Sequence, residues 1–243
     1  MILNGKRENY IWVKIPRTGT VSYEKFFNIY NKFPEHKDAF DNVTHWHHTY
    51  GQSIAVFGKL PGVSVVRHPL SRFISSLKYM TLTKMTCLEK GCIKRTPTNN
   101  MICDAHQFVD FLSSTNECIK FLTENFTYNC CLKKYPTRTF LQRHKLYEVL
   151  QVQDPQFVQS FFTTQVEFSY HPKVKNFRYE EIETFNEWIE EVLGYDTSLL
   201  THDNSSQHVN INVDFNHPEF IKATEMLFYD DYKAFNYPLQ YLT

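Results

Sequence analysis

Two segments in the first third of the chain constrain its fold most strongly. In each, a run of β-branched and aromatic residues leads into a short polar turn and then into a helix-like pattern, first over residues 10–22 and again over residues 63–76. A recurring strand–turn–helix unit is typical of an α/β domain built on a parallel sheet. Open parallel sheets bind ligands at the carboxyl ends of their strands, so we expect both turns to form binding sites there.

The first turn has the features of an anion cradle. Arg17 supplies a fixed cation, and Gly19 permits close approach of the main chain to a ligand. The next residues are expected to present N–H groups and hydroxyls at the start of a helix, where the dipole favours negative charge. The predicted contacts are Lys14, Arg17, Thr18, Gly19, Thr20, Val21 and Ser22. The chain has no G-x-x-x-x-G-K-[ST] motif, and these residues alone also fit an ordinary turn with an exposed arginine.

The second turn predicts a phosphate site more specifically. Arg67 directly follows the apolar run 63–66, and Pro69 suits the first turn of a helix. Ser75 follows about two helical turns after Arg67 on nearly the same face, so a guanidinium and a hydroxyl are expected to converge on one phosphate. Arg72 in the same segment is expected to be either a helix-surface charge or a packing partner.

These motifs resemble those of a known family. Residues 15–22 resemble the 5′-phosphosulfate loop of sulfotransferases that use 3′-phosphoadenosine 5′-phosphosulfate (PAPS), and residues 67–75 resemble their 3′-phosphate-binding strand and helix. Residues 177–182 and 228–237 resemble the family's closing pattern. The resemblance is closest to the heparan and uronyl 2-O-type carbohydrate sulfotransferases. One departure is that the family usually carries lysine where this chain has Arg17.

The resemblance implies a fold and an activity. It implies a P-loop-kinase-like α/β fold, with a parallel sheet flanked by helices, in a single domain over residues 1–243 with a loop or lid insert at about 81–104. It also implies a PAPS-dependent O-sulfotransferase that moves the sulfuryl group to an acceptor hydroxyl. PAPS would be the co-substrate, and no metal would be required.

A histidine cluster lies between the two turns. Residues 44–51, Thr-His-Trp-His-His-Thr-Tyr-Gly, resemble the stretch that supplies the catalytic base in the 2-O-sulfotransferases. The resemblance assigns the base to His47 with His45 as its neighbour, while His45 and His48 stay alternatives for the base. Trp46, His48 and Tyr50 are candidate substrate contacts. A metal site, or a solvated loop with one core histidine, are competing interpretations of the cluster.

The cysteines and the other tryptophans have more ordinary interpretations. Cys87, Cys92, Cys103 and His106 allow a zinc site, but their spacing is unlike that of common zinc fingers, and free thiols in the insert are the favoured prediction. Trp12 and Trp188 are expected to pack in the core.

Charge and hydropathy limit the partners. The 26 basic and 26 acidic residues balance, so the chain has no general field for nucleic acid or an anionic membrane. An apolar leader and a membrane-spanning run are both absent, which predicts a soluble cytoplasmic protein, or a Golgi lumen protein only if the chain is trimmed. The expected partner is an acceptor with a free hydroxyl, favouring a glycan or small molecule over a lipid or protein. The rival functions are a kinase-like phosphotransferase and a non-catalytic nucleotide- or glycan-binding protein.

Periodicity predicts the main elements. The strands are expected at 9–15, 63–66 and 174–179, and the helices at 22–32, 69–80, 105–113, 117–125, 182–193 and 218–235. Residues 139–153 and 157–168 are ambiguous between strand and helix. Gly194 is expected to end the helix before it.

Overall fold

The computed structural model describes residues 1–30, 48–89, 110–124, 126–129, 137–140, 162–201 and 209–242. The chain divides into two compact units. The first unit comprises Met1–His68 and Thr164–Asn204, and the second comprises Pro69–Thr163 and Ser205–Thr243.

The first unit is built around a four-stranded sheet of order β1-β2-β3-β6. Its strands are β1 (Ile2–Asn4), β2 (Asn9–Val13), β3 (Gly62–Val66) and β6 (Val174–Arg178). The last three run parallel, and β1 pairs antiparallel with β2 at the edge. The α/β class is therefore confirmed, and the three predicted strands are present; the antiparallel edge strand β1 was not predicted.

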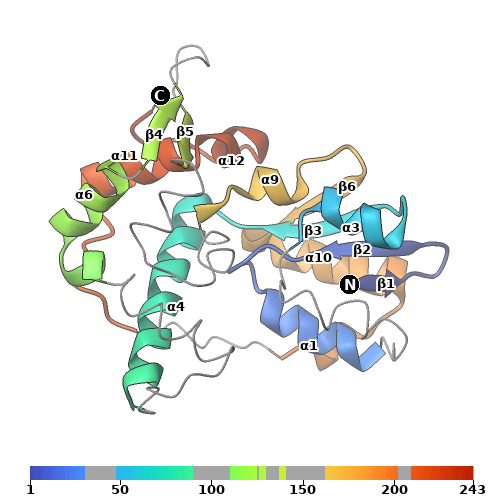
Figure 1. Ribbon diagram of the computed structural model, residues 1–243. Coiled ribbons are helices and arrows are strands. Elements are labelled where there is room, and N and C mark those ends of the chain that lie inside the picture. Colours follow the sequence, from blue (N-terminus) through green and yellow to red (C-terminus); the bar gives the residue numbers. More distant parts are fainter. Residues whose placement is uncertain are drawn as a thin grey trace. The chain divides into compact units, whose positions relative to one another are not determined.

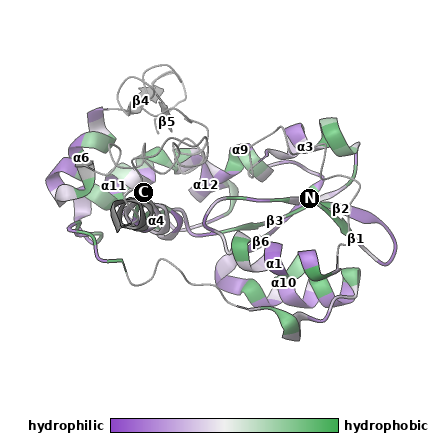
Figure 2. Ribbon diagram, turned by 60° about the horizontal axis from the view of Figure 1, so that its bottom comes forward, coloured by the Kyte–Doolittle hydropathy of each residue, from purple (hydrophilic) through white to green (hydrophobic). Residues whose placement is uncertain are grey.

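Helices cover both faces of this sheet (Figures 1 and 2). On one face lie α1 (Thr20–Tyr30) and α10 (Ile182–Trp188), and on the other lie α3 (Tyr50–Phe57) and the short α9 (Gln165–Ser169). A π-helical turn, Ile189–Leu193, extends α10 up to Gly194. Gly194 has a φ of 79°, a left-handed conformation that glycine adopts at no steric cost, so the predicted helix stop is confirmed.

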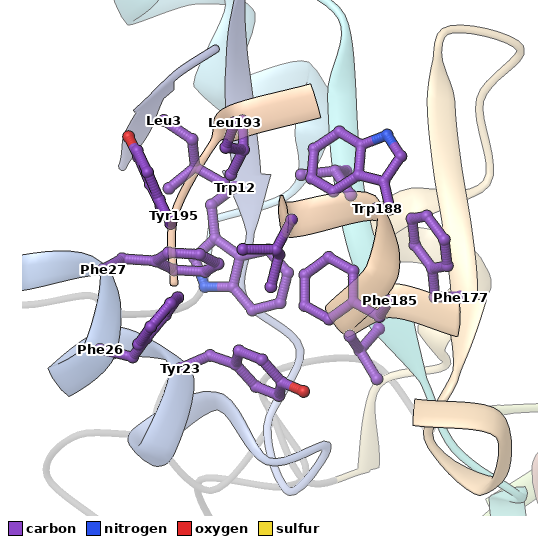
Figure 3. Packing of buried hydrophobic residues seen from close by; sticks show 13 residues of the cluster. Leu3, Trp12, Tyr23, Phe26, Phe27, Phe177, Phe185, Trp188, Leu193 and Tyr195 are labelled. Atoms are coloured by element: carbon purple, nitrogen blue, oxygen red, sulfur yellow. The ribbon is translucent and has the colours of Figure 1, made fainter. Parts of the chain in front are cut away.

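Aromatic side chains form the core between the sheet and the α1–α10 layer, as Figure 3 shows. Trp12 of β2 stacks on Phe185 of α10, with ring centroids 5.5 Å apart, and meets Phe27 of α1 edge-on at 5.4 Å. Trp188 packs against Phe177 of β6 in the same cluster. Both tryptophans are buried, so their predicted place in the core is confirmed. Helix α1 contributes Phe26 and Phe27 to this core, and it begins shortly after the carboxyl end of β2.

In its described residues, the second unit is mainly helical. Its elements are α4 (Pro69–Glu89), the 3₁₀ turn η1 (Asp110–Ser113), α6 (Thr115–Glu124), α11 (Pro218–Leu227), α12 (Tyr229–Ala234), and the antiparallel pair β4 (Phe126–Asn129) and β5 (Thr137–Phe140). Among the described residues, no helix is both long and apolar enough to cross a bilayer.

Two helix boundaries in this unit differ from the sequence prediction. Helix α4 continues to Glu89 rather than ending at residue 80, so residues 81–89 are helical and not part of a loop. No glycine or proline interrupts the chain there before Gly91, which leaves nothing to stop the helix earlier. The rest of the expected insert, residues 90–104, lies outside the described residues. The last predicted helix is broken at Phe228, a fully buried residue with a non-helical φ of −111°.

Arg72 is a packing partner and not a surface charge. Its side chain is completely buried, its Nη2 donates to the carbonyl of Thr163 at 2.6 Å, and its guanidinium lies 5.2 Å from the centroid of the Phe228 ring. Burial lowers the pKa of Arg72 to about 10, while the nearby Asp231, also fully buried, opposes that shift. Arg72 therefore stays charged at neutral pH and links α4 to α12.

Candidate anion-binding site

The turn after β2 is held in an unusual backbone conformation. Arg17 and Gly19 both have positive φ, 67° and 80°. Between them, Thr18 is fully buried, and its hydroxyl donates to the carbonyl of Ile15 at 2.9 Å, which closes the turn on itself. Helix α1 begins immediately afterwards at Thr20, so its first backbone N–H groups have no acceptor within the helix.

The left-handed backbone of Arg17 is sterically unfavourable. A left-handed backbone costs a residue with a side chain roughly 1–2 kcal/mol. Such residues persist where the surrounding structure over-determines them, and they cluster at ligand-binding sites. Here Nη1 of Arg67 donates to the carbonyl of Arg17 at 3.3 Å. The strained turn is thus supported by the arginine that the sequence predicts to bind phosphate.

Three neighbouring strand ends converge at this turn. Arg67 follows β3, and its guanidinium carbon lies 4.8 Å from the centroid of the Tyr179 ring. Tyr179 follows β6, and a Cβ built on Gly19 would lie only 3.0 Å from Cε2 of that ring. The expectation that the turns after β2 and β3 lie together at the carboxyl edge of the sheet is therefore met within the first unit. The Arg67 guanidinium and the backbone of the glycine turn lie together there.

The backbone just beyond β3 is held by side chains from other elements. The side-chain amide of Gln165 accepts from the N–H of Arg67 and donates to its carbonyl, both at 2.8 Å. The carboxylate of Glu180 accepts from the N–H of His68 at 2.8 Å. Sequence reasoning did not find Gln165, because it lies 98 positions from Arg67 and belongs to no local pattern. Its helix does carry a local signal: Thr164 caps α9 by accepting from the N–H of Glu167.

The remaining predicted residues of the first turn take different positions. Lys14 forms an ion pair with Glu24 of α1 at 3.0 Å. Thr20 and Ser22 are buried at the start of α1, whereas the side chain of Val21 is half exposed. Ser75 lies on α4, in the second unit. Its convergence with Arg67 on one phosphate stays a prediction.

Most of the histidine cluster lies outside the described residues. This applies to His45, Trp46 and His47, whose roles stay predictions. His48 is described and lines a small cavity beside Lys14 and Trp12. Tyr50 is buried as the first residue of α3, and its hydroxyl donates to the carbonyl of Leu60 at 2.7 Å. Burial also raises the pKa of Tyr50.

Helix α3 was missed in the sequence, although a signal for it was present. The hydroxyl of Thr49 accepts from the N–H of Gln52 at 3.2 Å, and the amide oxygen of Gln52 accepts from the N–H of Thr49 at 2.8 Å. This reciprocal pair of hydrogen bonds is a capping box, which the sequence pattern Thr-x-x-Gln predicts. The helix therefore begins within the histidine-rich segment 44–51.

The described residues hold no group of three or more histidine, cysteine or acidic side chains placed to bind a metal. Of the cysteine-rich set, Cys92, Cys103 and His106 lie outside the described ranges. Cys118, on α6, is a buried free thiol whose pKa burial raises to about 12. Burial therefore favours the protonated thiol at neutral pH.

Comparison with known proteins assigns no family to this chain: no family model, curated protein or solved structure matches it significantly. Its function is therefore inferred from the geometry of the site and from the motifs of its sequence.

Proposed function

We propose that this chain is a PAPS-dependent O-sulfotransferase with a P-loop-kinase-like sheet, in which the turn after β2 binds the 5′-phosphosulfate. One observation carries the proposal: the Arg67 guanidinium lies beside the glycine turn, with its Nη1 at 3.3 Å from the Arg17 carbonyl. Three features of the molecule thus meet at one place, namely a left-handed turn, the start of a helix and a second arginine.

The turn has the physical properties of an anion site. Left-handed residues such as Arg17 and Gly19 allow successive N–H groups to form a concave nest for anions. The helix that starts at Thr20 adds its partial positive charge to the same region. Arg67, restrained by the ring of Tyr179, supplies a full charge with a fixed fork geometry.

The same residues favour sulfuryl transfer over phosphoryl transfer. A nucleoside triphosphate site on this fold uses a lysine and a hydroxyl residue at the helix start, whereas this chain has Gly19, Thr20 and Val21 there, with no lysine. PAPS carries its 3′-phosphate and 5′-phosphosulfate on one ribose, so two anion positions are needed within a small region. Arg67 and, by prediction, Ser75 serve the 3′-phosphate.

In the mechanism that we propose, one residue activates the acceptor hydroxyl and the turn after β2 stabilises the leaving group. His47 removes the proton from the acceptor hydroxyl, and the acceptor oxygen attacks sulfur in line. The bond between sulfur and the 5′-phosphate oxygen breaks, and the electron pair stays with the departing adenosine 3′,5′-bisphosphate. Arg17 and the backbone N–H groups of Thr18 to Thr20 stabilise that charge. An arginine suits this role, because the bisphosphate needs charge stabilisation and not a proton.

Calorimetry with two nucleotides tests the proposal. Adenosine 3′,5′-bisphosphate should bind more tightly than AMP, since only the bisphosphate carries a 3′-phosphate. Arg67→Ala should remove about 1.5–3 kcal/mol of that preference, the contribution of a charged hydrogen bond. Arg178→Ala is the matched control: it removes one guanidinium from the same edge of the sheet, where Arg178 pairs with Glu181. Equal affinity of the wild-type protein for both nucleotides would refute the assignment of Arg67.

A further inference from the structure

The N–H and the carbonyl of Arg67 both form hydrogen bonds with one partner, as they would with a neighbouring strand. The parallel pairing of β3 with β6 ends at Val66, opposite Arg178. Arg67, the next residue, has both its N–H and its carbonyl bonded to the side-chain amide of Gln165, at 2.8 Å each. The amide thus replaces a neighbouring strand at the position where the sheet stops.

Gln165 is itself fixed. It is completely buried as the first residue of α9, and the hydroxyl of Ser169 one turn later donates to its carbonyl. Among side chains of this length, only an amide can both accept from an N–H and donate to a carbonyl, since a carboxylate has no donor and a thioether offers neither strong group. The pair of hydrogen bonds to the Arg67 backbone therefore requires the side-chain amide of a glutamine at position 165.

Two hydrogen bonds to one residue constrain the peptide groups on both sides of its Cα. They therefore set the direction in which the Arg67 side chain leaves the backbone. That direction brings the guanidinium over Tyr179 and against the carbonyl of Arg17.

We infer that Gln165 is a positioning residue for the cofactor site, acting through Arg67 without touching the ligand. The inference rests on the proposed function, in which Arg67 binds the 3′-phosphate. It predicts that loss of the Gln165 amide weakens the 3′-phosphate preference only while the arginine is present.

A double-mutant cycle in the full-length protein tests this dependence. Gln165→Met keeps the length of the side chain and removes both hydrogen bonds. Calorimetry would give the affinities for adenosine 3′,5′-bisphosphate and AMP in the wild-type protein, in Gln165→Met, in Arg67→Ala and in the double variant. Ser53→Ala is the matched control, because it removes a buried hydroxyl that donates to the carbonyl of Thr49 at the start of α3, another helix on the same face of the sheet.

Gln165→Met should lower the bisphosphate affinity about fivefold or more with a smaller change for AMP, since the Arg67 backbone loses the two hydrogen bonds that direct its guanidinium. Ser53→Ala should keep the wild-type preference. In the Arg67→Ala background, Gln165→Met should have no further effect. If the substitution weakens binding equally in both backgrounds, or leaves the preference intact, the positioning role is refuted.

The two proposals fail differently. A wild-type protein without a preference for the bisphosphate overturns the proposed function and the role of Gln165 with it. A wild-type preference that Gln165→Met retains overturns only the role of Gln165. If Gln165→Met does not fold, the same cycle with Gln165→Asn decides the matter, since that amide is one methylene too short to bond both groups and should show the same dependence on Arg67.

Discussion

Substitution of Gly19 by alanine should damage both the turn and its ligand site. Gly19 has a φ of 80°, and a Cβ there would lie 3.0 Å from Cε2 of Tyr179. The left-handed backbone alone costs an alanine about 1–2 kcal/mol. The contact is also shorter than the optimum of about 3.5 Å between carbon atoms, so the Tyr179 ring must shift. That ring lies under the guanidinium of Arg67, and its displacement should disturb the anion site.

The expected result is a loss of at least about 1–2 kcal/mol in the free energy of unfolding, measured by urea denaturation, together with weaker binding of adenosine 3′,5′-bisphosphate. Two glycines of the same unit serve as controls. Gly58 has a φ of 81° with no atom within 4 Å of a built Cβ, so Gly58→Ala should show the backbone cost without loss of binding. Gly51 lies exposed within α3, so Gly51→Ala should keep stability or raise it. Wild-type bisphosphate affinity in Gly19→Ala would refute the assignment of this turn.

Three further predictions concern other parts of the chain. His47→Ala should lower kcat by roughly 10²–10⁴-fold with bisphosphate binding nearly intact, and His45→Ala should lower kcat less. The wild-type rate should fall at low pH as the imidazole is protonated. An inactive His45 variant beside an active His47 variant would assign the base to His45. Elemental analysis should find no stoichiometric zinc, and chelator should leave the melting temperature unchanged, whereas one equivalent of zinc would contradict free thiols in segment 87–106. Arg72→Met should destabilise the protein by about 1.5–3 kcal/mol in urea, because the buried hydrogen bond from the charged Nη2 to the Thr163 carbonyl is lost. An unchanged midpoint would contradict a stabilising role for the buried guanidinium.

Local patterns were enough to predict the parallel strands and most helices of the described chain. Strands β2 and β3 consist largely of apolar residues that end at polar turns, β6 buries Val174 and Phe177 among polar residues, and Gly194 ends a helix in a left-handed conformation. Two of the elements that were not predicted carried weaker signals. Strand β1 has only three residues, and the capping box of Thr49 that starts α3 lies inside the histidine-rich segment 44–51.

Long-range contacts could not be predicted in this way. Gln165 reaches Arg67 across 98 positions, and nothing in its own neighbourhood distinguishes it from a surface glutamine. The burial of Arg72 likewise depends on Phe228 and Asp231, which come from the other end of the chain. In both cases the tertiary fold decides what a polar side chain does, and no spacing in the sequence records it.

Sulfuryl transfer is the most direct test of the proposed function. The purified chain would be incubated with PAPS labelled in its sulfuryl group and a panel of glycan and small-molecule hydroxyl acceptors, in parallel with ATP labelled in its terminal phosphate. We expect label to pass from PAPS to at least one acceptor, to be strongly reduced in Arg17→Ala and His47→Ala, and not to pass from ATP. Transfer of phosphate from ATP with none of sulfate from PAPS would contradict the account and make the chain a kinase-like enzyme.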